Sequence, residues 1–345
     1  MTLSIIQSCI GDDMHAVDTV IRKSLHSEVT LVNQIAEYIV NSGGKRLRPA
    51  LVLLSAGLFG GINDKHHQLA AVVEFIHTAT LLHDDVVDES SKRRGQYTAN
   101  AMFGNAASVL VGDFVYSRAF QMMVAIQNMR VMEVLAEATN VIAEGEVLQL
   151  LNVHNADITD AAYLQVIHYK TAKLFEAATR LGAIISVSSA ADEAALAQYG
   201  MRLGTAFQLI DDVLDLSGDA EVIGKNLGDD LAEGKPTLPL LYAMRHGTAE
   251  QSAVIRRAIE GAGKSVSTQA NNELNDAKSN GLESNRLDEL PAVLQAVAET
   301  GALDHVRGVA KSEADSACAA IAHFSDSQFK IALLSLAEFA VSRSY

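Results

Sequence analysis

The sequence predicts an all-α protein, and three observations support that class. Apolar residues recur at spacings of three, four and seven along most of the chain, as they do on one face of a helix. Proline is scarce, with 4 residues among 345, while alanine, leucine and valine are frequent in nearly every segment. No run alternates as a strand does, and no Asn-Gly turn joins two alternating runs.

The predicted helices follow one another from the amino terminus. The first spans 12–42 and ends at Gly43 and Gly44, and Pro49 lies just inside the start of the next helix. Further helices are predicted over 67–90, 102–125, 129–151, 160–189, 193–217, 238–245, 249–260, 287–299, 303–322 and 326–342.

One polar segment interrupts this pattern. Residues 264–285 are rich in asparagine and serine, so residues 262–286 are predicted to form a surface insertion or a mobile loop. The insertion is an alternative domain boundary, but only about 60 residues follow it, fewer than a typical domain contains. We therefore expect a single domain over 1–345, with a C-terminal lobe packed on one bundle.

Composition excludes several functions. Lys and Arg (27) against Asp and Glu (42) give a net charge of −15, and such an acidic surface repels nucleic acid. The two cysteines, Cys9 and Cys318, are too few for a disulfide scaffold and have no metal-binding spacing. The first residues lack the features of a targeting peptide, and the longest apolar runs, such as 51–62, are shorter than the about 18–20 residues that span a bilayer. We expect a cytoplasmic protein with no transmembrane segment.

Two copies of the pattern D-D-x-x-D give the strongest functional signal. The first lies in LLHDDVVDE at 81–89 and the second in QLIDDVLD at 208–215, each on a predicted helix. Positions one and five of the pattern lie on the same helix face, one turn apart, whereas position two lies about 100° away. The second aspartate is therefore either a further ligand or a supporting group. The candidate metal ligands are Asp84, Asp85, Asp88, Asp211, Asp212 and Asp215.

Repulsion within these motifs indicates a bound cation. One such cluster fits a solvated helix face equally well, but two matching clusters on apolar helices favour a site. Like charges one turn apart destabilise a helix, and burial increases the cost. Carboxylates without cysteine or convergent histidine suit Mg²⁺, which completes its coordination with water and phosphate oxygens. The motifs thus predict a diphosphate held through Mg²⁺ between two acidic walls.

Basic groups near glycine breaks and acidic motifs are suited to a second anion. NSGGKRLRP at 41–49 and KRRG at 92–95 are the densest basic stretches, although any one base alone is consistent with ordinary surface charge. His77 lies seven residues before Asp84, within about 20° of it around the helix. A lone histidine is commonly a core residue, but this position predicts a phosphate contact.

These motifs, in this order, resemble those of the trans-isoprenyl diphosphate synthases, and most closely the long-chain bacterial members of that family. They cover about 40–245, and similarity is weaker towards both ends. The resemblance implies a single bundle of long helices around a deep central cavity, usually dimeric. The motifs are GGKRLRP at 43–49, DDVVD at 84–88, RRG at 93–95, Lys170-Thr171, FQLIDDVLD at 207–215, GKNLGDD at 224–230 and GKPTLP at 234–239.

The resemblance also implies roles for individual residues. Asp84 and Asp88 match metal ligands for the allylic diphosphate, and Asp211, with Asp212 and Asp215, completes the site opposite them. Positions that hold isopentenyl diphosphate are matched by Lys45, Arg48, His77 and Arg94. Positions around the allylic substrate are matched by Arg93, Lys170, Thr171, Gln208, Lys225 and Lys235. Catalysis is expected to depend on Asp84, Asp88, Asp211, Lys170 and Lys225.

The expected mechanism follows from the charges. Mg²⁺ and the basic groups stabilise the departing diphosphate, so that the allylic C–O bond ionises and the isopentenyl double bond attacks the carbocation. A proton then leaves, and the resemblance implies that the released pyrophosphate accepts it.

Small side chains before the first aspartate motif predict a long product. Ala79 and Thr80 stand where the resemblance places bulky aromatic residues in short-chain members. We expect the growing tail to pass Thr80, and a floor near Phe120 and Met123 to set the final length. The resemblance implies an octaprenyl product for quinone side chains. Alternatively, Ala79 only packs against a neighbouring helix.

Alternative functions remain open at this point. A synthase with a shorter or different product would carry the same motifs. A terpene cyclase needs no isopentenyl diphosphate site, so GGKRLRP and His77 argue against it. A non-catalytic subunit would be expected to have eroded aspartate motifs, whereas both are complete here. The homodimer and a weak membrane association also stay open.

Overall fold

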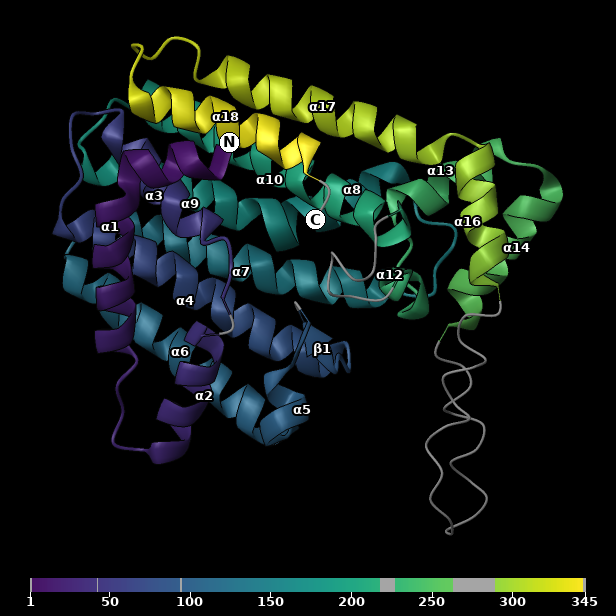
Figure 1. Ribbon diagram of the computed structural model, residues 1–345, viewed down its shortest axis with the longest axis horizontal. Coiled ribbons are helices and arrows are strands. Elements are labelled where there is room, and N and C mark those ends of the chain that lie inside the picture. Colours follow the sequence, from purple (N-terminus) through teal and green to yellow (C-terminus); the bar gives the residue numbers. More distant parts are fainter. Residues whose placement is uncertain (1, 42, 94, 218–226, 263–288, 344–345) are drawn as a thin grey trace.

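The chain folds into a bundle of helices (Figure 1). The computed structural model describes residues 2–41, 43–93, 95–217, 227–262 and 289–343. Within these residues the first helices are α1 (Thr2–Ser24), α2 (Thr30–Asn41), α3 (Leu47–Gly57), α4 (Asp64–Val87), α5 (Ala99–Phe103), α6 (Asn105–Ile126) and α7 (Met129–Asn152). They are followed by α8 (Asp160–Ile167), the π-helical turn η1 (His168–Ala172), α9 (Lys173–Ile185) and α10 (Ala190–Ser217). The C-terminal helices are α12 (Asp229–Ala232), α13 (Leu238–His246), α14 (Ala249–Gly261), α16 (Leu290–Glu299), α17 (Ala302–Ala320) and α18 (Gln328–Ser342).

The all-α prediction is confirmed, with one small exception. β1 (Lys92–Arg93) and β2 (Gln96–Tyr97) form an antiparallel hairpin directly after the first aspartate motif. The sequence did not predict this hairpin, because strands of two residues are too short to show alternation.

The single helix predicted over 12–42 is wrong. α1 begins at Thr2 and ends at Ser24, and α2 begins at Thr30. Asn33 folds back on the connecting segment, where its Oδ1 accepts the backbone N–H of Ser27 (2.9 Å) and its Nδ2 donates to the Ser27 carbonyl (2.7 Å). Such side chain–backbone hydrogen bonds compete with continuation of a helix.

The long helices pack around one large apolar core. α10 contacts α9 and α17, and α4 contacts α3 and α6. α3 and α9 come very close at Gly182, where an added Cβ would lie 2.6 Å from the carbonyl oxygen of Val52. Val306 and Ala310 of α17 share a smaller cluster with Leu209 of α10, so the C-terminal helices pack directly on the bundle.

Some predictions fall on residues outside the described part of the chain. These are Arg94, Lys225 and nearly all of the polar segment 262–286. The single domain with a polar insertion therefore stays a prediction.

α6 and α7 expose apolar side chains. α6 is long and apolar enough to cross a membrane by length and composition alone, and only 33% of that stretch is buried. The sequence prediction places this helix at 102–125, and Asp113 and Arg118 lie within its apolar run. Across both helices the exposed apolar residues include Leu110, Val124, Met129, Val147, Leu150 and Leu151. This surface is largely uncovered in the single chain.

Candidate functional site

The predicted site residues gather around one cavity of about 780 Å³. Its walls come mainly from α4, α7, η1 and α10, together with the segments that precede α3 and α13. Of the predicted site residues, the cavity is lined by Lys45, Arg48, His77, Thr80, Asp84, Asp88, Arg93, Lys170, Thr171, Gln208, Asp211, Asp212, Asp215 and Lys235. Motifs up to 190 residues apart in sequence thus meet at one place.

Positions one and five of each aspartate motif face this cavity, as their helical spacing predicts. Asp84 and Asp88 come from the end of α4, and Asp211 and Asp215 come from α10. Burial raises the pKa of Asp84, and the charge of Lys170 only partly offsets the effect. Three of these carboxylates lie beside a basic group: Asp84 Oδ2 is 3.7 Å from Lys170 Nζ, Asp88 Oδ2 is 3.1 Å from Lys235 Nζ, and Asp211 Oδ1 is 2.6 Å from Arg343 Nη2.

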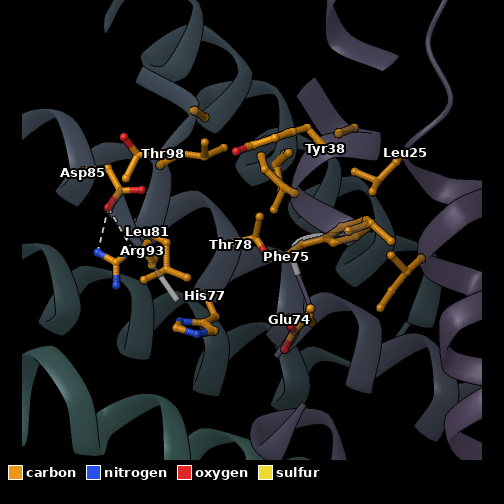
Figure 2. A pocket seen from close by; sticks show the side chains of 18 of the residues that line it. Leu25, Tyr38, Glu74, Phe75, His77, Thr78, Leu81, Asp85, Arg93 and Thr98 are labelled. Carbon is orange, nitrogen blue, oxygen red and sulfur yellow. Dashed lines mark hydrogen bonds and ion pairs between the residues drawn. The ribbon is translucent and has the colours of Figure 1, made fainter. Parts of the chain in front are cut away.

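The second aspartate of each motif is buried and holds another predicted site residue. Asp85 Oδ1 accepts hydrogen bonds from Nε (2.8 Å) and Nη2 (2.7 Å) of Arg93, and Figure 2 shows this pair. Asp212 accepts hydrogen bonds from the Tyr163 hydroxyl and from Gln208 Nε2 (2.9 Å). Burial, together with the charge of Asp230, raises the pKa of Asp212 to about 8. Both aspartates therefore support neighbouring side chains in this structure.

Lys170 and Thr171 project from the η1 turn, which two glycines allow to pack very closely. A Cβ on Gly145 of α7 would lie 2.7 Å from the backbone nitrogen of Lys170. A Cβ on Gly204 of α10 would lie 2.6 Å from Cα of Ala172. Single π-helical turns of this kind are frequent at functional sites. The predicted helix over 160–189 is therefore interrupted at two of its predicted site residues.

Three further residues of the site belong to no recognised motif. Lys170 Nζ lies 2.6 Å from Glu146 Oε2 and 2.6 Å from Gln149 Oε1, both on α7. Burial raises the pKa of Glu146 to about 7, and the charge of the adjacent Lys170 offsets only part of this rise. Arg343 reaches the cavity from the C-terminal end of α18 and stacks 3.7 Å from the ring of Phe207. Glu146 and Gln149 are three residues apart and so share a helix face, a pattern from which the sequence could have predicted them as site residues. No sequence pattern marks Arg343 as a site residue.

The basic wall is built by Lys45, Arg48 and His77. Nη1 of Arg48 lies 3.1 Å from Nε2 of His77, and its guanidinium lies 4.7 Å from the centre of the Phe175 ring. Lys45 Nζ lies 5.2 Å from the centre of the Phe339 ring. These aromatic contacts hold long cationic side chains in place beside the acidic walls.

A smaller pocket of about 90 Å³ adjoins the basic wall (Figure 2). Leu25 and Phe75 contribute to its apolar lining, and it shares His77 and Arg93 with the main cavity. Between the two cavities, Arg46 is paired with Glu74 at 2.9 Å. The pocket thus lies behind the phosphate-binding candidates.

The chain-length candidates are divided between cavity and core. Thr80 lines the cavity, and its hydroxyl donates to the His77 carbonyl (2.8 Å). Ala79 and Met123 are fully buried in the apolar core that includes α4 and α6, and they do not line the cavity. The channel past Ala79 therefore stays a prediction.

The donor set fits a hard cation that needs few protein ligands. In the part of the chain that the structure describes, no three acidic, histidine or cysteine side chains are grouped so as to hold a metal by themselves. Mg²⁺ usually takes one or two carboxylates and obtains its other ligands from water and phosphate. Asp84, Asp88, Asp211 and Asp215 provide carboxylates of this kind on two walls.

An all-helical bundle with paired aspartates and a separate basic wall around one cavity defines an enzyme that handles phosphorylated substrates through a divalent cation. The chain belongs to the polyprenyl synthetase family, whose model matches residues 29–275, and it is a prenyltransferase.

Similarity to relatives extends over the full chain. Octaprenyl diphosphate synthase of Escherichia coli (strain K12) is 50% identical over 343 residues, which are 99% of each chain. All-trans-nonaprenyl-diphosphate synthase (geranyl-diphosphate specific) of Rhodobacter capsulatus is 42% identical and covers 97% of this chain and 96% of its own. The polyprenyl synthase of Caulobacter crescentus CB15, solved in complex with calcium and isoprenyl diphosphate, has a TM-score of 0.89 at 42% identity over 99% of this chain and 98% of its own.

Proposed function

We propose that this prenyltransferase is a long-chain trans-polyprenyl diphosphate synthase with an octaprenyl product, used for quinone side chains. It adds isopentenyl diphosphate units to an allylic diphosphate such as farnesyl diphosphate. The observation that carries the proposal is the single cavity in which two aspartate pairs face a separate basic wall. The 50% identity to an octaprenyl diphosphate synthase supports the product length, and the nonaprenyl relative makes nonaprenyl the alternative product.

The allylic diphosphate lies between α4 and α10 in this proposal. Asp84 and Asp88 on one wall and Asp211 and Asp215 on the other would hold Mg²⁺, which would supply positive charge to neutralise the departing diphosphate. The ammonium groups of Lys170 and Lys235, already beside Asp84 and Asp88, are near enough to turn towards the diphosphate oxygens. By the family pattern, Lys225 joins them.

Isopentenyl diphosphate occupies the basic wall. Arg48 offers a planar guanidinium, Lys45 a point charge, and His77 an imidazole directly against Arg48. By the family pattern, Arg94 adds a fourth group. Arg93 is held by Asp85 and, by the family pattern, belongs to the allylic substrate.

The reaction requires charge stabilisation and alignment rather than a protein nucleophile. The allylic C–O bond breaks and diphosphate departs towards the cationic side chains. The isopentenyl double bond then forms the new carbon–carbon bond with the allylic carbocation. Transfer of a proton to the released diphosphate restores a double bond. The side chains of the cavity hold the two substrates in line and replace water around the cation.

The exposed apolar residues of α6 and α7 support a homodimer. Leu110, Leu150 and Leu151 are each more than 60% exposed in the single chain, and a second copy is the simplest cover for such a surface. We infer that a dimer interface, rather than a membrane span, explains the apolar character of α6. The enzyme is then cytoplasmic.

A magnesium-dependent assay separates the candidate functions. The synthase consumes isopentenyl diphosphate when farnesyl diphosphate and Mg²⁺ are present and stops when EDTA removes the metal. A terpene cyclase converts the allylic substrate without using isopentenyl diphosphate, and a non-catalytic subunit converts neither. Failure to consume isopentenyl diphosphate contradicts the proposal.

A further inference from the structure

Tyr163 lies outside every motif, yet it contacts the second aspartate motif directly. It is on α8, its side chain is buried, and its hydroxyl donates a hydrogen bond to Asp212 Oδ2. Leu238, three residues after Lys235, packs in the same apolar cluster as Tyr163. One buried phenol therefore joins α8, α10 and the segment that carries Lys235.

A continuous chain of hydrogen bonds leads from Tyr163 to the cavity. The other oxygen of Asp212 accepts from Gln208 Nε2 (2.9 Å), and Gln208 Oε1 accepts from the Thr171 hydroxyl (3.0 Å). Gln208 faces Asp212 with its amide nitrogen, which donates, and Thr171 with its amide oxygen, which accepts. The amide oxygen of Gln208 is thereby directed at Thr171, and both residues line the cavity beside Lys170.

We propose that Tyr163 is a positioning residue for prenyl transfer, which acts through Asp212 to fix the Gln208 amide and the Thr171 hydroxyl. The inference rests on the proposed function. Oriented dipoles contribute to catalysis when they are aligned before charge develops, because no reorganisation is then needed during the reaction. Without the phenol, Asp212 loses one of its two donors and the Gln208 amide is free to rotate.

Tyr199 is the control that separates a positioning role of Tyr163 from a purely structural one. Tyr199 is also fully buried, and its hydroxyl donates a 2.7 Å hydrogen bond to the carbonyl of Leu333. It does not line the cavity. Tyr163→Phe and Tyr199→Phe therefore each remove one buried hydroxyl, but only the first interrupts the chain that ends at Thr171.

The test is steady-state kinetics of both phenylalanine variants with farnesyl and isopentenyl diphosphates. We expect kcat to fall about tenfold in Tyr163→Phe, with KM for isopentenyl diphosphate unchanged within about twofold, because the basic wall is not part of the chain. Tyr199→Phe should retain wild-type kcat. Equal kcat values in the two variants overturn the inference alone. A wild-type protein that makes no prenyl product overturns the proposed function, and the inference fails with it.

Asp212→Asn provides a second test that leaves Tyr163 in place. The asparagine amide presents N–H groups to Gln208 and so turns its amide, while the size of the side chain is kept. We expect kcat to fall about tenfold at saturating Mg²⁺, with half-saturating Mg²⁺ changed by less than about threefold. If higher Mg²⁺ restores wild-type kcat, Asp212 acts as a metal ligand and the positioning role is wrong.

Discussion

Replacing Gly145 with alanine tests whether close packing of α7 on the η1 turn positions Lys170. The added Cβ would lie 2.7 Å from the Lys170 nitrogen and 2.8 Å from Tyr169 Cβ, whereas ordinary contacts begin near 3.4 Å. α7 and the turn must therefore separate by about 0.7 Å. Overpacking of this kind costs about 1–3 kcal/mol, while alanine in a helix gains about 1 kcal/mol over glycine. The expected net loss of stability is about 0–2 kcal/mol.

The effect on activity should exceed the effect on stability. Misplacement of a reacting group by about 1 Å lowers a rate by as much as about 100-fold, so we expect kcat to fall about tenfold or more. Gly308→Ala on α17 is the matched control, because an added Cβ there meets nothing within 4 Å. It should gain about 1 kcal/mol and keep its activity. Urea unfolding and incorporation of labelled isopentenyl diphosphate measure the two effects. Wild-type kcat in Gly145→Ala would show that the close packing of α7 on η1 does not position Lys170.

Three further predictions concern product length, assembly and pH. Ala79→Tyr places a large ring in the closed core between α4 and α6 and should shorten the product, as measured by chromatography. A product of unchanged length would exclude a channel past residue 79. Leu151→Arg puts a charge on the exposed apolar surface of α7 and should give a monomer in sedimentation. Val187, which is 90% exposed and lies outside α6 and α7, provides the control, because Val187→Arg should leave the dimer intact. A Leu151→Arg protein that remains a dimer argues against this interface. Burial raises the pKa of Glu146 from 4.5 to about 7, so the folded state binds this proton more tightly than the unfolded chain. The proton on Glu146 therefore contributes its full stabilisation below about pH 4.5, and this stabilisation is lost as the pH rises to about 7. In Glu146→Gln, the urea unfolding midpoint should fall less over this pH range than it does in the wild type.

The sequence predicted the helices well where the apolar spacing is long and regular, as in α4, α7 and α10. It also predicted which aspartates face the cavity, because the helical period alone determines that Asp84 and Asp88 share a face. It failed between α1 and α2, where the hydrogen bonds of Asn33 end the regular pattern without any glycine or proline.

The supporting residues were harder to predict, because they depend on contacts between distant elements. From the sequence, Tyr163 is an ordinary residue on the apolar face of α8, and only the packing of α10 places Asp212 against it. Glu146 likewise looks like a surface carboxylate in the sequence, and only the packing of η1 on α7 places Lys170 beside it. The roles of Asp85 and Asp212 stayed open for the same reason, because helical spacing places them about 100° around the helix from the other aspartates but does not show which side chains they contact.

The octaprenyl product is tested most sharply by sizing the chain made from farnesyl diphosphate, isopentenyl diphosphate and Mg²⁺. We expect isopentenyl diphosphate to be consumed only when Mg²⁺ is present and the chain to end at eight isoprene units. A product that stops at three or four isoprene units, or no use of isopentenyl diphosphate, would contradict it.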